Sequence, residues 1–392
     1  MDAPEDHAPA DAAPVAASLD GAAAWDAFVA RCVNGSYLQA SAWAVVTAPN
    51  GWTSARVTAD AGDGGTIGAQ LLLRRPRPLP WAFAYAPRGP VATSWSPAAV
   101  GRFTDALRAA SIGRVSHVRI DPEIEAGGPV DPEGSVAEAF RAAGWQPTRP
   151  VQPASTRVID LAVGEAALWS GLKKKWRQYV NKARTAGVTV VDGGDDPIEP
   201  FYRIYRETAD RAGFLIRTER AYRDVWEAFR PSGDARMLFA VDGDGTPQAA
   251  LFLVHNGSRV IEPYGGMTGT GADLRANYLL KWEAIRGSAE AGATSYDLWG
   301  LAQPGIAHFK AGFGGREVRY IGGFDLVLSG LGRRVYGSAQ AARVVLARRR
   351  AGLPPATGAR TGADTTEATE PPDAPGATES SGVSGPGAGP AA

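Results

Sequence analysis

The lysines of this chain are concentrated where they could bind an anion. Only six of the 392 residues are lysines, against 35 arginines. Four of the six, Lys173, Lys174, Lys175 and Lys182, lie in one predicted helix, which is either a solvated face or a contact for a polyanion. Lys310 lies in the segment FKAGFGG, and glycines let a backbone approach a ligand closely. We therefore expect Lys310 to act on a ligand.

Other common catalytic groups are not indicated. The histidines, at positions 7, 117, 255 and 308, are not spaced for a metal, and Cys32 is the only cysteine. The chain has no P-loop, no G-x-S-x-G elbow and no dinucleotide fingerprint. Two matches to the acetyl-CoA loop pattern, at Arg230 and Arg334, do not join a strand to a helix. The sequence therefore predicts no metal, no cofactor and no covalent catalysis by serine or cysteine.

The formal net charge is zero, but the acidic and basic residues are unevenly distributed along the chain. Segments 1–18 and 351–392 carry nine acidic residues and one basic residue, which leaves 40 basic and 32 acidic residues in 19–350, a net charge of +8. Of the last 42 residues, 34 are Ala, Gly, Pro, Thr or Ser, so we expect both terminal segments to be disordered. With no export signal and no apolar run of membrane length, the sequence predicts a cytoplasmic protein.

An internal duplication indicates the fold. Each copy has an antiparallel meander (52–89 and 237–266), an amphipathic helix (97–111 and 274–290), a strand (116–121 and 294–299) and a short helix with an aromatic residue, a cation and a glycine. The cation is Arg141 in the first copy and Lys310 in the second. We predict an α/β (α+β) protein of two tandem lobes, 19–160 and 161–330.

Two predicted helices have basic edges. In helix 165–186, Lys173, Arg177 and Arg184 lie along one edge of the apolar side. Helix 331–350 contains six arginines beside an apolar stripe. It either docks across the lobes or lies on the anionic inner face of a membrane, as a peripheral contact.

Four segments resemble, in their order, the Fem (FemXAB) family of aminoacyltransferases. They are LWSGLKKKWRQYVNKARTAGVTV, FYRIYRETADRAGF, YGG followed by LRANYLLKWEAIRGSAEAGATSYDLWG, and AHFKAGFGGREVRYIGGFDL. The resemblance covers about 20–350 and implies two acetyltransferase-like (GNAT-like) lobes, in agreement with the duplication. Only Pro231 to Ala235 separate helix 218–230 from the next strand, so we expect no inserted helical hairpin of the kind some members have.

The resemblance also implies site residues. Arg211 falls at a phosphate-binding arginine, Tyr264 at a site tyrosine, Lys310 with Phe309 near the tRNA acceptor end, and Asp121 at an acidic position of the first lobe. Asp121 could take a proton from the attacking ammonium or simply end a strand in an Asp-Pro turn, and Tyr264 could be a packed strand aromatic. Thr47 stands where the family often has a lysine. Either Lys173 or Arg177 supplies that cation, or the acceptor is bound differently.

We therefore expect a tRNA-dependent aminoacyltransferase. By resemblance, it moves an amino acid, with glycine as one candidate, from aminoacyl-tRNA to an amine of a peptidoglycan precursor stem peptide, lipid II or a UDP-linked form, in interpeptide bridge formation. Two alternatives stay open. One is the same transfer to a small molecule in specialised metabolism, and the other is a non-catalytic tRNA- or membrane-binding module.

Overall fold

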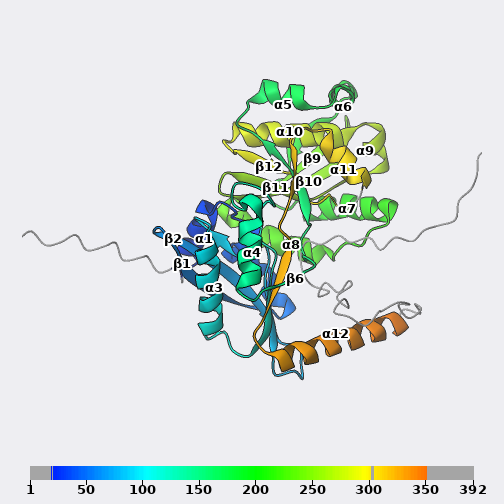
Figure 1. Cartoon of the computed structure of the whole chain (residues 1–392). Helices are drawn as coiled ribbons and strands as arrows, with labels where there is room; N and C mark the ends of the chain where they lie inside the picture. Colours follow the sequence, from blue (N-terminus) through cyan, green and yellow to red (C-terminus); the bar gives the residue numbers. More distant parts are fainter. Residues whose placement is uncertain (1–18, 20, 302–303, 351–392) are drawn as a thin grey trace, which may run out of the picture.

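The computed structural model describes residue 19 and residues 21–301 and 304–350, which form two lobes, each built on a seven-stranded mixed sheet (Figure 1). This architecture confirms the predicted α/β class with two tandem lobes. The segments predicted to be disordered, 1–18 and 351–392, lie outside the described residues.

The first sheet has the strand order β1-β2-β3-β5-β14-β6, with β4 paired to β2. Its strands are β1 (Thr53–Gly62), β2 (Gly65–Arg74), β3 (Ala82–Ala86), β4 (Val91–Ala92), β5 (Val115–Ile120), β6 (Gln146–Thr148) and β14 (Gly323–Val327). The helices of this lobe are α1 (Ala22–Arg31), α2 (Ser41–Thr47), α3 (Pro97–Ala109) and α4 (Ser135–Ala142). α3 begins at Pro97 because the Ser96 side chain accepts a hydrogen bond from the Ala99 N–H.

The second sheet has the order β13-β7-β12-β11-β10-β9-β8. Its strands are β7 (Ser155–Asp160), β8 (Thr189–Asp192), β9 (Ala235–Val241), β10 (Pro247–Asn256), β11 (Arg259–Met267), β12 (Ser295–Asp297) and β13 (Arg316–Arg319). The helices of this lobe are α5 (Glu165–Gly171), α6 (Lys174–Thr185), α7 (Ile198–Ala212), α8 (Glu219–Phe229), α9 (Gly269–Asp273), α10 (Ala276–Glu290) and α11 (Pro304–Ala311). Only a short 3-10 turn, Arg230–Ser232, separates α8 from β9, which confirms that no helical hairpin is inserted there.

The two lobes exchange strands, which differs from the predicted boundaries. β7, placed by the sequence at the end of the first lobe, pairs with β12 and β13 of the second sheet. β14, placed in the second lobe, returns to the first sheet and pairs with β5 on one side and β6 on the other. Sequence patterns predict where strands lie but not which strand each one pairs with, because pairing is decided by long-range contacts. The chain therefore crosses between the lobes twice.

The predicted helix 165–186 is two helices. The extended backbone of Leu172 and Lys173, with ψ near 140°, separates α5 from α6. The Arg177 guanidinium donates to the carbonyls of Ser170 (2.8 Å) and Leu172 (2.6 Å), which lie at the end of α5. A helix end has unpaired carbonyls, and a cation that binds them stabilises the break.

An aromatic cluster fills the junction between the lobes. Tyr37 and Trp43 of the first lobe contact Phe229 of the second, at ring-centroid distances of 5.9 and 6.4 Å, and Tyr37 also contacts Trp299 at 5.9 Å. These rings are at most 5% exposed. Burial of several aromatic rings supplies a large apolar contribution, so the junction is part of the core and not a hinge between independent domains.

The last helix, α12 (Gly330–Arg350), begins on the first lobe. Tyr336 packs on Phe83 (5.5 Å) and His117 (5.3 Å), and Arg333 contacts Asp325 at 3.4 Å. These contacts dock the beginning of α12 on the first lobe. Within the described ranges, no helix is both long enough and apolar enough to span a membrane.

The position of β14 predicts a dependence of the first lobe on a segment far along the chain. Ending the chain after Arg319 removes β14, which leaves β6 without a partner strand and β5 paired only with β3, and it removes the buried side chains Phe324 and Leu326. We expect this variant to lose the cooperative unfolding of the first lobe, measured by hydrogen exchange and thermal denaturation. A chain ending after Ser329 keeps β14 and is the control. Equal protection of β5 in the two variants would contradict the prediction.

Candidate active site between the splayed strands of the second lobe

The candidate site lies where two parallel strands diverge. β11 and β12 pair in parallel from Arg259↔Ser295 to Ile261↔Asp297, after which β11 continues to Met267 without β12. Side chains and carbonyls near this point can face a ligand, because diverging strands leave backbone groups unpaired. α11 presents Lys310 to this point.

Two backbone carbonyls fix the Lys310 ammonium. Nζ donates to Trp299 O at 2.7 Å and to Gly300 O at 2.8 Å, which takes two of its three N–H donors. Burial of the group lowers the pKa of Lys310 to about 8; the Glu262 carboxylate opposes this shift, and the Lys281 ammonium adds to it. Lys310 is thus a positioned cation that changes charge near physiological pH.

A buried ion pair lies behind Lys310. Lys281 of α10 contacts the Glu262 carboxylate of β11, and their side chains are 2% and 5% exposed. The Tyr296 hydroxyl donates to the other Glu262 oxygen at 2.8 Å. Burying two charges is costly unless each is paired and hydrogen-bonded, as here. This pair is neutral as a whole and Asp297 is paired with Arg259, so the Lys310 ammonium is the charge left to favour an anionic ligand or transition state.

Aromatic rings line the side of the site toward α6 and α10. Lys281 Nζ lies 5.6 Å from the Phe309 ring and 5.8 Å from the Phe313 ring, and Tyr278 packs edge-on against Phe309 at 5.2 Å. The Trp176 indole donates to Phe309 O at 3.1 Å. Phe309 therefore positions α11 as well as lining the site.

The glycine beside Lys310 has a packing role that differs from the expected one. A Cβ at Gly312 would lie 2.2 Å from the Trp176 indole, so only glycine fits there. The Gly312 carbonyl also accepts the Lys173 N–H at 2.9 Å. The close approach in this segment is thus between α6 and α11, and it places Lys173 beside the site.

The predicted residue Tyr264 lies on β11, and the predicted residue Arg211 lies on α7 and contacts the end of β11. Arg211, at the end of α7, is exposed and donates to Met267 O at 2.9 Å. Tyr264 is 6% exposed and packs against Tyr205 and Tyr222 in the junction cluster. Arg211 is placed to reach a ligand at the end of β11, whereas Tyr264 is surrounded by other rings.

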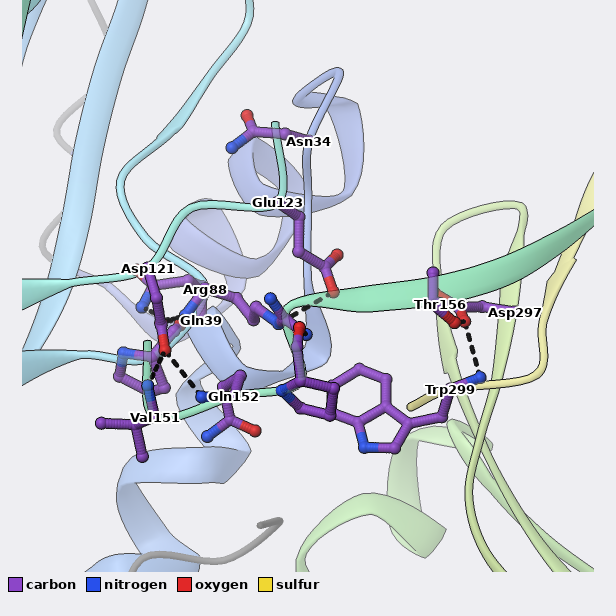
Figure 2. A network of polar contacts seen from close by, with 12 residues as sticks. Asn34, Gln39, Arg88, Asp121, Glu123, Val151, Gln152, Thr156, Asp297 and Trp299 are labelled. Atoms are coloured by element: carbon purple, nitrogen blue, oxygen red, sulfur yellow. Dashed lines mark hydrogen bonds and ion pairs between the residues drawn. The ribbon is translucent and has the colours of Figure 1, made fainter. Parts of the chain in front are cut away.

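The Asp121 carboxylate holds several segments of the first lobe together. Its carboxylate is 1% exposed and accepts four hydrogen bonds, from the Tyr85 hydroxyl (2.9 Å) and the N–H groups of Arg88 (2.8 Å), Val151 (3.0 Å) and Gln152 (2.8 Å). Burial raises the pKa of the Asp121 carboxyl, and the Arg88 guanidinium opposes this. A carboxylate with this many donors is fixed in place, so the geometry favours positioning of Arg88 over proton transfer (Figure 2).

Comparison with known proteins identifies the family. The model of the FemAB family matches residues 21–241 and 232–342. The chain belongs to the FemAB family. Its fold is similar to that in the crystal structure of FemX, with a TM-score of 0.70 and 21% identity over 79% of this chain and 96% of that one. The family resemblance and the two-lobed fold inferred from the sequence are confirmed.

Two proteins similar to this chain are named lipid II:glycine glycyltransferase. The protein from Staphylococcus saprophyticus is 27% identical over 224 residues, which are 55% of this chain and 53% of that protein. The protein from Staphylococcus aureus is 27% identical over 219 residues, 54% of this chain and 52% of that protein. The chain spans about half the length of these relatives.

Sequence reasoning did not identify the groups around Lys310. Lys281 is the sixth lysine of the chain, and its place in the apolar run LLKW of a helix is a signal of a buried cation. Glu262 stands in a strand, where a single carboxylate has no distinguishing spacing. The carbonyls of Trp299 and Gly300 are backbone groups, and no sequence motif indicates their direction.

The interaction between Lys281 and Glu262 can be tested by measuring the free energy of unfolding. Lys281→Met leaves the Glu262 carboxylate buried without its cation, and we expect a loss of about 3–5 kcal/mol in the free energy of unfolding. Adding Glu262→Gln removes the uncompensated charge, so the double variant should recover much of that loss. Denaturant unfolding of the single and double variants gives the coupling. Additive losses would show that the two groups do not interact.

Proposed function

We propose that this chain transfers an amino acid from aminoacyl-tRNA to an amine of a peptidoglycan precursor, with lipid II as the acceptor. The observation that carries the proposal is the Lys310 ammonium, held by two carbonyls at the point where β11 and β12 diverge. The matched relatives are named lipid II:glycine glycyltransferases, which favours glycine as the donated amino acid.

The chemistry suits a site without a nucleophilic side chain. The acceptor amine attacks the ester carbonyl carbon, a C–N bond forms, the C–O bond to the ribose breaks, and the amine proton ends on the ribose oxygen. Because the ester is already activated, the protein has mainly to align the two reactants and stabilise negative charge. The Lys310 ammonium can stabilise the oxyanion or the phosphate at the tRNA acceptor end.

The surface of α6 supports tRNA as the donor. Lys173, Lys174, Lys175 and Lys182 are exposed there, and a cation lies over the half-buried Tyr179 ring from each of two elements, Lys175 at 5.6 Å and Arg275 at 4.9 Å. Tyr179 in turn contacts Tyr278 at 4.8 Å, next to Phe309. Cations beside aromatic rings are typical of surfaces that bind single-stranded nucleic acid, and this surface leads to Lys310.

A lipid-linked acceptor places the reaction at the inner face of the membrane. The sequence of α12 contains Arg333, Arg334, Arg343 and Arg348–Arg350, and cations near an anionic leaflet each contribute about 1 kcal/mol. We also propose that α12 provides a peripheral contact with this face of the membrane. Co-flotation with anionic vesicles, compared between chains ending at 329 and at 350, tests it; equal flotation would reject it.

The decisive assay supplies labelled aminoacyl-tRNAs, one amino acid at a time. Purified lipid II and a UDP-linked precursor serve as acceptors in parallel, and the product is identified by mass. Transfer of glycine to lipid II supports the proposal. Transfer to neither acceptor with any aminoacyl-tRNA would overturn it, and transfer to the UDP-linked form alone would correct the acceptor.

The position of Lys310 predicts a large effect on rate. Lys310→Ala removes the charge at the reacting centre, and we expect transfer to fall by about two orders of magnitude or more with little change in thermal stability. Lys310→Arg should restore activity only in part, because a planar guanidinium does not fit a place shaped for a compact ammonium. Arg141→Ala, which removes an exposed cation of the first lobe, is a control for lost charge. Near-native turnover of folded Lys310→Ala would contradict the proposal.

The lowered pKa of Lys310 predicts a pH profile. Below about pH 8 the group is an ammonium, and above it the charge is lost. A reaction that needs this cation should therefore slow as the pH rises through about 8, although the attacking amine becomes more nucleophilic. In Lys310→Arg the alkaline decline should disappear, because the guanidinium stays charged. The same alkaline limb in both proteins, after correction for spontaneous ester hydrolysis, would assign it to another group.

A further inference from the structure

Trp299 adopts a backbone conformation that side chains disfavour. Its φ is +55°, in the left-handed region, where a residue with a Cβ is strained. The conformation is held locally because the Trp299 N–H donates to Asp297 Oδ1 at 2.7 Å, and Asp297 is fully buried. The Asp297 carboxylate also accepts from Thr156 and Arg259. A strained residue persists only where its surroundings fix it, and such residues concentrate at functional sites.

The Trp299 ring is held from the first lobe. The Arg88 guanidinium lies over it, with Cζ 5.1 Å from the ring centroid, and Tyr37 packs against it at 5.9 Å. Arg88 is 1% exposed and is fixed by Glu123, by Pro153 O (2.9 Å) and, through its N–H, by Asp121. Figure 2 shows Arg88 extending between Asp121 and Trp299. The first lobe thus clamps a residue of the second.

The clamped segment is the one that holds the Lys310 ammonium. The carbonyls of Trp299 and Gly300 accept both observed hydrogen bonds of Nζ, and their direction follows from the left-handed turn at Trp299. We propose that Trp299 is a positioning residue for Lys310 and that Arg88 couples this position to the closed junction of the lobes. The inference rests on the proposed function for its kinetic consequence, but its structural part concerns Lys310 alone.

The charged groups that face Lys310 determine how its pKa would change if Arg88 no longer held Trp299. They are Glu262 of β11, Lys281 of α10 and Asp297 of β12. Burial is the largest influence on the pKa of Lys310 and lowers it. If the Trp299 segment is released, water reaches the ammonium, so the pKa of Lys310 should rise toward its ordinary value of 10.5.

The test compares two buried arginines of the first lobe. Arg88→Met removes the guanidinium over Trp299 but keeps an apolar stem. Arg119→Met is the matched control, because Arg119 is also a mostly buried arginine in an ion pair, with Asp325 at 2.8 Å in the same sheet. Uniform ¹⁵N labelling of lysine gives signals from only six side chains, and Lys310→Arg assigns the one of interest. The readouts are the pKa of Lys310 from Nζ and the kcat and KM of transfer.

We expect Arg88→Met to raise the pKa of Lys310 by about one unit and to lower kcat about tenfold with less change in KM, whereas Arg119→Met alters neither. If both variants give the same pKa and the same kcat, the inference is overturned. If the enzyme transfers nothing but the pKa shift is found, the proposed function fails and the positioning role stands.

A second variant applies if Arg88→Met does not fold. Trp299→Gly keeps a residue that adopts the left-handed conformation freely but removes the ring that Arg88 clamps. The same rise in the pKa of Lys310 is expected, because the turn stays available but is no longer held. An unchanged pKa in folded Trp299→Gly would overturn the clamp.

Discussion

The contact between Glu123 of the first lobe and two arginines is the constraint on which the site depends. Glu123 pairs with Arg88 at 3.2 Å and with Arg259 at 2.6 Å, and Arg259 also pairs with Asp297. The carboxylates of Glu123 and Asp297 are at most 1% exposed. Charges so deeply buried are tolerated only with all their partners in place, so the network forms when the lobes are closed on each other. Closure then fixes the backbone that presents Lys310.

This dependence gives a reason for a two-lobed fold in which Lys310, the cation proposed to act in the reaction, lies in one lobe. The second lobe supplies Lys310, the nearby Lys281–Glu262 ion pair and the basic surface of α6. The first lobe supplies Asp121, which holds Arg88, and Arg88, which contacts Trp299 beside Lys310. The two halves of the duplication therefore have different tasks, although their element order is alike. In the first lobe the counterpart of Lys310 is Arg141, which is exposed and pairs only with Glu138 among the described residues.

The duplication and most of the helices could be predicted because local spacing indicates them, and the scarcity of lysine drew attention to Lys310, whose catalytic role stays a prediction. The exchange of β7 and β14 could not, since strand partners depend on contacts between residues far apart in sequence. Asp121 and Arg177 have the right charge for chemistry, and only their hydrogen bonds, to Arg88 N–H and to the end of α5, reveal structural tasks. The left-handed turn at Trp299 could not be predicted either, because a tryptophan in the sequence gives no sign of a positive φ.

The return of β14 to the first sheet has a consequence for synthesis on the ribosome. Residues near 50–150 emerge early, but the strand that lies between β5 and β6 is made only when residues 323–327 are translated. Until then the nascent first sheet has a gap with two exposed edges, which can pair with other chains. The first sheet therefore cannot be completed until the C-terminal part of the chain has been made. A chaperone that shields open strand edges would act during this interval.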